Sequence, residues 1–374
     1  MIYTDWANNE YRTKNKAFGG VSYYRIAKPA QYLKEWYDID IVGPDMKDKF
    51  GSTVEEMWTK VFLTYDLVWT KQIDNAQAAA ALLFFADYFK KPVVLDIDDN
   101  YFEVKPDQPG YQYYYPGSQK RAIFSSTISL VDALAVSTMP LGEYYKNHIK
   151  KVHNIDKEIF VLPNCNDIKD FPKPKKRKQT EKITIGYMGS ITHNADLKLV
   201  MPIIDKLLTE FPNLFFEVLG SVNSQSAGEV FEDLNEKNLD RIILKAGTPS
   251  WDGYPELIAK QEWDIGIAPL VDDDFTRGKS HIKWMEYAMY KIPCVASKVY
   301  PYFQPIDGVD VINGSNGLVA DNLQDWYLKL KNLIVNPALR QEMGDTAYEY
   351  VKNNWQYSQH AHKWKEAIDK ILKK

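Results

Sequence analysis

The segment spanning residues 275–289 holds the side chains best suited to bind an anionic ligand. Ser280 suits a helix N-cap, and a helix that starts there points free backbone N–H groups and the positive end of its dipole at a ligand. Lys279 adds a formal positive charge, so a diphosphate is the expected ligand. Lys283 and Glu286 share roughly one helix face, which leaves a carboxylate that can accept hydrogen bonds from ribose hydroxyls. The alternative is an ordinary amphipathic helix with a solvated Lys/Glu face.

A second group of chemically capable side chains is the acidic run at residues 96–100, Asp-Ile-Asp-Asp-Asn. The run follows an expected buried strand, so its carboxylates should emerge at the strand's carboxyl end and face a cleft. Three interpretations stay open. The run can bind a divalent cation through oxygen ligands, orient acceptor hydroxyls or act as a base, or cap the following helix or turn. We take Asp98 and Asp99 as catalytic and acceptor-side candidates and assign no metal site.

The elements that position these side chains alternate in type along the first half of the chain. Short β-branched runs at residues 39–44, 67–70, 93–96 and 134–137 are expected strands. Helical patterns lie between them, at residues 21–36, 75–89 and 118–130. Such alternation predicts a parallel sheet with helices on both faces.

The pattern breaks at residues 167–182 and then restarts. Pro172, Pro174 and the basic run at residues 175–178 interrupt every periodicity, so this segment is the expected linker. The basic run itself is either a contact for nucleic acid or an anionic membrane, or a solvated hinge.

A second alternating series follows the linker. Strands are expected at residues 183–190, 215–220, 242–244, 265–269 and 293–297, with helices at residues 196–211, 254–260, 281–289, 337–354 and 355–374. We therefore predict an α/β protein of two Rossmann-like domains facing a central cleft. Residues 1–168 form the acceptor side, 169–182 the linker, 183–354 the donor-nucleotide domain, and 355–374 a helix that packs back on the first domain.

Length and composition agree with two soluble cores. The chain has 374 residues, which favours two domains at roughly 150 residues each. Its net charge of −4 argues against nucleic-acid binding driven by the overall charge of the protein. No stretch approaches the roughly 20 apolar residues that span a bilayer, and the first residues lack a secretory signal, so a cytoplasmic protein is expected. Cys165 and Cys294 have neither metal-ligand spacing nor disulfide density, and we expect free buried thiols.

These motifs together resemble GT-B glycosyltransferases of family 4, a retaining group. The resemblance covers nearly the whole chain. Its motifs stand in the family's order at residues 19–21, 162–164, 186–190, 275–289 and 293–296. It implies that Glu286 binds the donor ribose, that Lys279 and neighbouring amides hold the diphosphate, and that no metal is required. It also implies that the C-terminal helix crosses back to the first domain and that the domains close on the donor.

The chain departs from the family pattern at two places. The family usually has a first glutamate eight positions before the one matched by Glu286, and here that residue is Gly278. Asp272, Asp273 or Asp274 can substitute from the preceding loop. The family's basic pair after the expected strand at residues 183–190 is also missing, and His193 and Lys198 are the nearest candidates for its phosphate role.

Glycines and short polar residues complete the predicted site. Gly19 and Gly20 resemble the family loop that approaches donor phosphates and acceptor, because glycine permits close approach; the alternative is a plain turn. On the donor side the candidates are Gly19, Gly20, Gly189, Ser190, His193, Gly220, Lys279, Ser280, Lys283 and Glu286. On the acceptor side they are Tyr23, Arg25, Asp98 and Asp99, although the sequence does not fix the rotation of the helix that holds residues 23–25.

The reaction implied by the resemblance is a front-face transfer with retention, in which the leaving diphosphate helps to accept the acceptor's proton. Fixed donors around that phosphate stabilise the transition state. A UDP-sugar is the first expectation for the donor and a GDP-sugar the next. The acceptor is a glycan, a lipid carrier, a protein side chain or a hydroxymethylated DNA base. A sugar-nucleotide epimerase and a non-catalytic sugar-binding scaffold are the alternatives. No Gly-x-Gly-x-x-Gly follows an expected strand, which disfavours a nicotinamide-dependent oxidoreductase.

Overall fold

The computed structural model describes residues 1–4, 19–43, 46–71, 73, 75–174, 181–190, 193–220, 222, 227–248 and 250–373. The basic run at residues 175–178, for which we weighed a nucleic-acid or membrane contact, lies outside the described residues. Within the described ranges, no helix combines the length and the apolar character that crossing a membrane requires.

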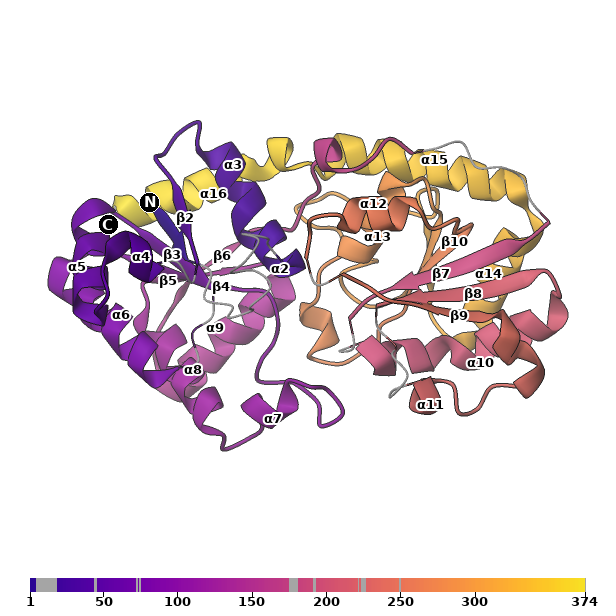
Figure 1. The fold of residues 1–374 in the computed structure, drawn as a ribbon, viewed down its shortest axis with the longest axis horizontal. Helices are drawn as coiled ribbons and strands as arrows, with labels where there is room; N and C mark the ends of the chain where they lie inside the picture. The colour runs from indigo at the N-terminus through magenta and orange to yellow at the C-terminus, as the bar shows by residue number, and fades with distance from the viewer. Residues whose placement is uncertain are drawn as a thin grey trace.

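Two parallel sheets organise the molecule, as predicted (Figure 1). In the part of the chain that the structure describes, each sheet has six strands, where the sequence predicted four and five. The first sheet has the order β2-β1-β3-β4-β5-β6 and the second β12-β11-β10-β7-β8-β9. The strands of the first sheet are β1 Ile2–Thr4, β2 Asp40–Val42, β3 Val68–Lys71, β4 Val93–Ile97, β5 Ala133–Val136 and β6 Glu158–Val161. Those of the second are β7 Ile183–Met188, β8 Leu214–Leu219, β9 Ile242–Lys245, β10 Ile265–Ala268, β11 Cys294–Ser297 and β12 Leu318–Ala320.

Helices connect the strands on both faces of each sheet. Those of the first half are α2 Gly20–Ser22, the π-helix η1 Tyr23–Ala27, α3 Lys28–Leu33, α4 Met46–Phe50, α5 Val54–Thr64, α6 Ala76–Phe89, α7 Tyr111–Tyr114, α8 Gln119–Leu130, α9 Met139–His153 and the 3-10 turn η2 Ile168–Asp170. Those of the second half are α10 Asn194–Glu210, α11 Ala227–Val230, the 3-10 turns η4 Glu236–Arg241 and η5 Thr276–Gly278, α12 Tyr254–Ala259, α13 Ile282–Met289, α14 Leu323–Val335, α15 Pro337–Asn354 and α16 Tyr357–Leu372.

Sequence patterns located many of the long buried elements but missed several others. The patterns did not single out β1, β6 and β12, which have three or four residues each, because so few residues carry no periodicity. Helices α5, α9 and α14 were also missed. In α9, Pro140 and Gly142 stand in the first turn, and both residue types argue against a helix. The remaining expected strands and helices agree with the structure to within a few residues at each end.

The strand register brings the ends of β4 and β5 to one edge. Ile97 pairs with Val136 at the last position of both strands. The residues that follow, Asp98 and Asp99 on one side and Thr138 on the other, therefore leave the sheet at the same edge. This edge faces the second domain, as expected for the carboxyl ends of parallel strands in an open α/β sheet.

The C-terminal helix crosses back to the first domain, as predicted (Figure 1). Helix α15 lies along the second domain, and α16 packs against α3 of the first. The chain crosses between the domains in the short segment between α15 and α16. There the Asn166 N–H donates to Trp355 O at 2.9 Å, and the Asn166 carbonyl accepts from Tyr357 N at 2.9 Å. The two chain segments that join the domains are therefore hydrogen-bonded to each other.

Three apolar clusters make the core, one in each domain and one that spans both. The spanning cluster includes Tyr24 of the first domain, Met285 of the second and Trp364 of the crossing helix. Cys165 and Cys294 belong to it and are free, buried thiols, as expected.

Candidate functional site

A cavity of about 600 Å³ lies between the two domains. Almost every residue that we predicted for the site lines it. The lining includes Gly20, Arg25, Asp98, Asp99, Gly189, Ser190, His193, Gly220, Lys279, Ser280, Lys283 and Glu286. Of the residues chosen for the donor and acceptor sides, Gly19 and Tyr23 are not in the lining.

Helix α13 begins one residue later than the N-cap prediction placed it. Its N-cap is His281, which makes no side-chain cap bond, and the helix runs over Ile282–Met289. Ser280 was therefore the wrong cap. Its Oγ instead accepts a hydrogen bond from Asn164 Nδ2 of the first domain at 2.9 Å, because Lys279 is extended and turns the serine toward that domain. The first turn of α13 thus keeps its N–H groups free of side-chain caps at the edge of the cavity.

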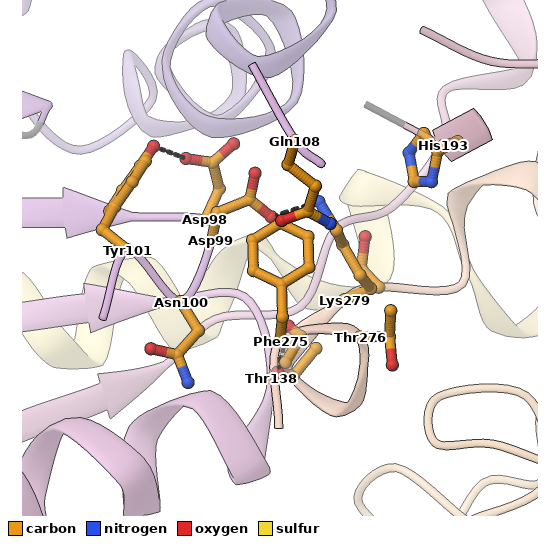
Figure 2. A network of polar contacts seen from close by, with 12 residues as sticks. Asp98, Asp99, Asn100, Tyr101, Gln108, Thr138, His193, Phe275, Thr276 and Lys279 are labelled. Carbon is orange, nitrogen blue, oxygen red and sulfur yellow. Dashed lines mark hydrogen bonds and ion pairs between the residues drawn. The ribbon is translucent and has the colours of Figure 1, made fainter. Parts of the chain in front are cut away.

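Lys279 faces the acidic run across the cavity (Figure 2). Its Nζ lies 2.6 Å from Asp99 Oδ1, and it also lies 4.4 Å from the centre of the Phe275 ring. The lysine side chain is 15% exposed and the aspartate 28%, so the pair is accessible from the cavity. An ammonium group has three donors, and Lys279 can therefore hold Asp99 and an anionic ligand at the same time.

The carboxylates of the acidic run serve different purposes. Asp96 accepts two hydrogen bonds from the Arg25 guanidinium, at 2.7 and 3.2 Å, and a third from Trp69 Nε1 at 3.1 Å. Asp98 accepts from the Tyr101 hydroxyl at 3.3 Å, and its pKa is raised by burial and by the neighbouring charge of Asp99. Asp96 is therefore part of the architecture, while Asp98 and Asp99 face the cavity.

The structure bears on two other interpretations of this run. Among the described residues there is no group of three or more His, Cys, Asp or Glu side chains that could hold a metal ion. The local capping contact comes from Asn100, whose Oδ1 accepts from the N–H of Phe102 at 3.3 Å. The two aspartates at the cavity are therefore not used as caps in the described contacts.

The rotation of the first helix, which the sequence leaves open, is set by the π-helix η1. Tyr23 turns away from the cavity, stacks on Trp251 with ring centres 3.7 Å apart and donates its hydroxyl to Asp170. Tyr23 was thus the wrong acceptor-side choice. Arg25 reaches the lining, but its guanidinium is held by Asp96 and is 1% exposed. Tyr24, which lies between Tyr23 and Arg25 in the sequence, is the residue of this π-helix that faces α13 across the cavity lining. The wider turn of a π-helix sets this direction.

Glu286 has a tyrosine on each carboxylate oxygen. The Tyr24 hydroxyl donates to Oε1 at 2.8 Å, and the Tyr254 hydroxyl donates to Oε2 at 2.9 Å. Burial raises the pKa of Glu286 to about 7, against the lowering effect of the two phenol hydrogen bonds and of Lys283. Because Tyr24 belongs to the first domain and Tyr254 to the second, this carboxylate lies where the domains meet.

Lys283 and His193 form the other polar wall of the cavity. Lys283 Nζ lies 3.4 Å from His193 Nε2, and His193 Nδ1 lies 2.8 Å from Asp196 Oδ2. Burial and then the charge of Lys283 lower the pKa of His193 to about 4, so the ring is neutral and its Nδ1–H points at the aspartate. Burial lowers the pKa of Lys283 to about 8. Lys198, the other candidate for a phosphate contact, pairs with Glu232 at the surface and is not in the lining.

Glycines let three loops of the second domain meet at the cavity. A Cβ on Gly220, whose φ is +85°, would lie 2.9 Å from Gly189 O, and a Cβ on Gly247 would lie 2.9 Å from Gly220 Cα. Neither approach tolerates a side chain. Sequence analysis missed Gly247 and also Tyr254, although a Gly-Thr-Pro turn after a strand was a usable signal for the first.

Gly278, which replaces the family's first glutamate, lies against the first domain. A Cβ there would be 3.1 Å from Leu141 Cδ1, and the Gly278 carbonyl accepts from Thr138 Oγ1 at 2.9 Å. A side chain at this position would require Leu141 to shift by a few tenths of an ångström.

The three aspartates proposed as substitutes are used elsewhere, and none lines the cavity. Asp272 and Asp274 pair with Arg277, and Asp273 Oδ1 accepts from the backbone of Phe275 and Thr276. That expectation was wrong, because the loop uses its own carboxylates to hold its turn.

Comparison with known proteins identifies the fold. No family model matches the sequence, and no curated protein matches it. Among solved structures, the glycosyltransferase from Rickettsia africae has a TM-score of 0.62 at 15% identity, with 100% of this chain and 98% of that chain covered. HepE from Anabaena, in complex with UDP and glucose, has a TM-score of 0.60 at 10% identity, with 98% of each chain covered.

A third similar structure is a variant of TarM from S. aureus in complex with Fondaparinux, alpha-GlcNAc-glycerol and UDP. Its TM-score is 0.59 at 16% identity, with 85% of this chain and 59% of that chain covered. The chain thus spans less than two thirds of the length of that protein. Identities this low establish the fold alone: the chain has the GT-B fold of two Rossmann-like domains that face a cleft.

Proposed function

We propose that this chain is a glycosyltransferase that moves a hexosyl or pentosyl group from a nucleotide sugar, a UDP-sugar first and a GDP-sugar next, to an acceptor hydroxyl. The observation that carries the proposal is the convergence of Lys279, Lys283 and Glu286 on one cavity between the domains. Two cations and a buried carboxylate match the two polar parts of a nucleoside diphosphate, its phosphates and its ribose. HepE and the TarM variant, which share the fold, were solved with UDP bound.

The diphosphate has a set of fixed donors in this proposal. Lys279 and the free N–H groups at the start of α13 bind its charge, and the glycine loops at Gly189 and Gly220 let the donor lie against backbone. Ser190 and His193 line the same wall. Negative charge grows on the leaving diphosphate as the glycosidic bond breaks, so donors already in place stabilise the transition state more than the ground state.

The acceptor lies on the side of the first domain, between Gly20 and the carboxylates of Asp98 and Asp99. A Cβ on Gly20 would meet nothing within 4 Å, so this loop leaves open space toward the cavity. The raised pKa of Asp98 suits a group that orients an acceptor hydroxyl and accepts its proton. The acceptor classes covered by the proposal are a glycan, a lipid carrier, a protein side chain and a hydroxymethylated DNA base.

The reaction proposed for this site is a metal-independent transfer with retention, as in family 4. The acceptor hydroxyl attacks from the face that the diphosphate leaves. Residues 1–168 supply the acceptor side, 183–354 the donor side, 169–182 link them, and 355–374 return to the first domain. The contact of Asn164 with Ser280 at 2.9 Å supports this division, because it joins the acceptor side to the donor segment at the cavity.

Isothermal titration of UDP, GDP and their sugar conjugates tests the donor site. We expect one nucleotide to bind at micromolar levels, and Lys279→Ala to weaken it by about 1.5–3 kcal/mol because a charged hydrogen bond is lost. Lys329→Ala is the matched control, since that lysine pairs with Asp325 at 2.8 Å on α14 and does not line the cavity. If no nucleotide binds the wild type, the transferase proposal fails and a non-catalytic scaffold takes its place.

A further inference from the structure

The carboxylate of Glu286 is held by two phenols that leave part of its acceptor capacity unused. Tyr24 occupies one acceptor position of Oε1, and Tyr254 occupies one of Oε2. Each carboxylate oxygen has two acceptor positions. Among the contacts of the described residues, one position per oxygen therefore stays open, and all three side chains line the cavity. Two open acceptor positions on one carboxylate match the two adjacent hydroxyls of a ribose.

We propose that Tyr24 and Tyr254 are positioning residues that fix Glu286 as an anionic acceptor for the donor ribose, so that the ribose site is complete only when the two domains are together. This inference rests on the proposed function, because it takes Glu286 as the ribose contact. It adds that the donor site in the second domain needs a hydrogen bond from the first domain. Tyr24 lies on η1 of the first domain, and Glu286 lies on α13 of the second.

The charge state of Glu286 explains why two phenols are needed. Only an ionised carboxylate keeps both of the open acceptor positions beside the two phenols, because protonation turns one of them into a donor. Glu286 is 4% exposed, and burial favours its neutral form. The hydrogen bonds from Tyr24 and Tyr254 and the charge of Lys283 act in the opposite direction. The other titratable groups nearby are the phenols of Tyr290 and Tyr302.

Tyr24 also has an alternative partner on its own side of the cleft. Its hydroxyl lies 3.2 Å from Asn166 Oδ1, in the segment whose backbone pairs with Trp355 and Tyr357 at the domain crossing. When the domains part, the phenol can donate to Asn166 and is not left as a buried unpaired group, which would be costly. The Tyr24 hydroxyl therefore keeps a hydrogen-bond partner when the domains part, while the ribose site loses one of its two supports.

The test compares two nucleotides across pH. UDP and 2′,3′-dideoxyuridine diphosphate share the base and the phosphates, so the ratio of their affinities isolates the ribose hydroxyls from phosphate titration. The ratio is measured by isothermal titration between pH 6 and 9 for the wild type, Tyr24→Phe, Tyr254→Phe and the control Tyr290→Phe. Tyr290 is a buried phenol at the end of the same helix, but its hydroxyl donates to Pro255 O at 2.7 Å and not to Glu286.

The wild type should prefer UDP above the pKa of Glu286, which is about 7, and lose that preference as the pH falls through it. Either phenylalanine variant at Tyr24 or Tyr254 removes a bond that lowers this pKa. The midpoint should therefore move to higher pH, and the ratio at pH 7 should fall about 5- to 20-fold. Tyr290→Phe should match the wild type, and a thermal melt of each variant checks that it is folded.

The outcomes separate this inference from the proposed function. If the wild type binds UDP no better than the dideoxy compound at any pH, Glu286 is not the ribose contact and the donor site itself is in error. If the wild type discriminates but Tyr24→Phe and Tyr254→Phe keep its ratio and midpoint, the positioning role is overturned alone. A higher ratio in Tyr24→Phe also overturns it, because Tyr24 would then compete with the ribose.

Discussion

Two ion pairs between a basic side chain and an aspartate, at the same strand end, differ in what they do. Arg25 and Asp96 form a bidentate pair whose side chains are each 1% exposed. Lys279 and Asp99 form a single contact at 2.6 Å with side chains 15% and 28% exposed. A buried pair whose donors and acceptors are filled by protein has no capacity left for a ligand, whereas a pair at a cavity wall does. Burial, more than residue type, therefore separates architecture from site in the acidic run.

The largest expected effect comes from breaking the buried pair. Arg25→Ala leaves the Asp96 carboxylate buried without its cation and also removes the bond to Asn164 Oδ1 at 3.1 Å. We expect a loss of about 3–5 kcal/mol in the free energy of unfolding, as for other buried pairs from which one partner is removed. Urea denaturation of the wild type and the variant measures it. Lys90→Ala, which removes a surface pair with Asp87, is the control, and an equal loss in the two variants would contradict the distinction.

A smaller effect should appear in the pH dependence of stability, through Glu286. Its pKa in the folded protein, about 7, lies above the ordinary value of 4.5. The folded state therefore binds this proton more tightly than the unfolded state, and the stabilisation is full below about pH 4.5 and lost as the pH rises to about 7. The contribution is at most about 3 kcal/mol.

Glu286→Gln should remove this part of the pH dependence. Thermal melts of the wild type and the variant between pH 4.5 and 8 measure it. The quantity to compare is the difference in melting temperature between the two proteins at each pH, because other groups titrate in both. If the melting temperatures of the two proteins depend on pH in the same way, burial does not raise the pKa of Glu286 above its ordinary value, and this prediction is wrong.

The smallest expected effect on stability comes from breaking the cavity pair. Asp99→Asn removes one charge of a partly exposed contact, which typically contributes about 0–1 kcal/mol. The same change should lower glycosyl transfer, because Asp99 faces the acceptor side of the cavity. Urea denaturation together with a transfer assay separates the two readouts. A loss of stability as large as that of Arg25→Ala would mean that Asp99 is structural as well.

The sequence predicted the donor side of the site more fully than the acceptor side. Lys279, Lys283 and Glu286 lie on or beside one short helix, so their spacing alone puts them near each other. Gly278 could not be judged in the same way. Its role depends on Leu141 and Thr138 of the other domain, which are more than a hundred positions away in the chain.

The sequence by itself determined two parallel sheets and the residue types that meet at the cleft, because buried strands and amphipathic helices show in local periodicity. The crossing of the C-terminal helix was an expectation from the family resemblance and not from periodicity. Only the tertiary structure decided that Tyr24 and not Tyr23 faces Glu286, and that Asp96 is buried with Arg25 while Asp98 and Asp99 stay at the cavity. Both decisions follow from contacts between distant segments. A one-residue change in helix rotation, here set by a π-turn, redirects a side chain without altering any local pattern.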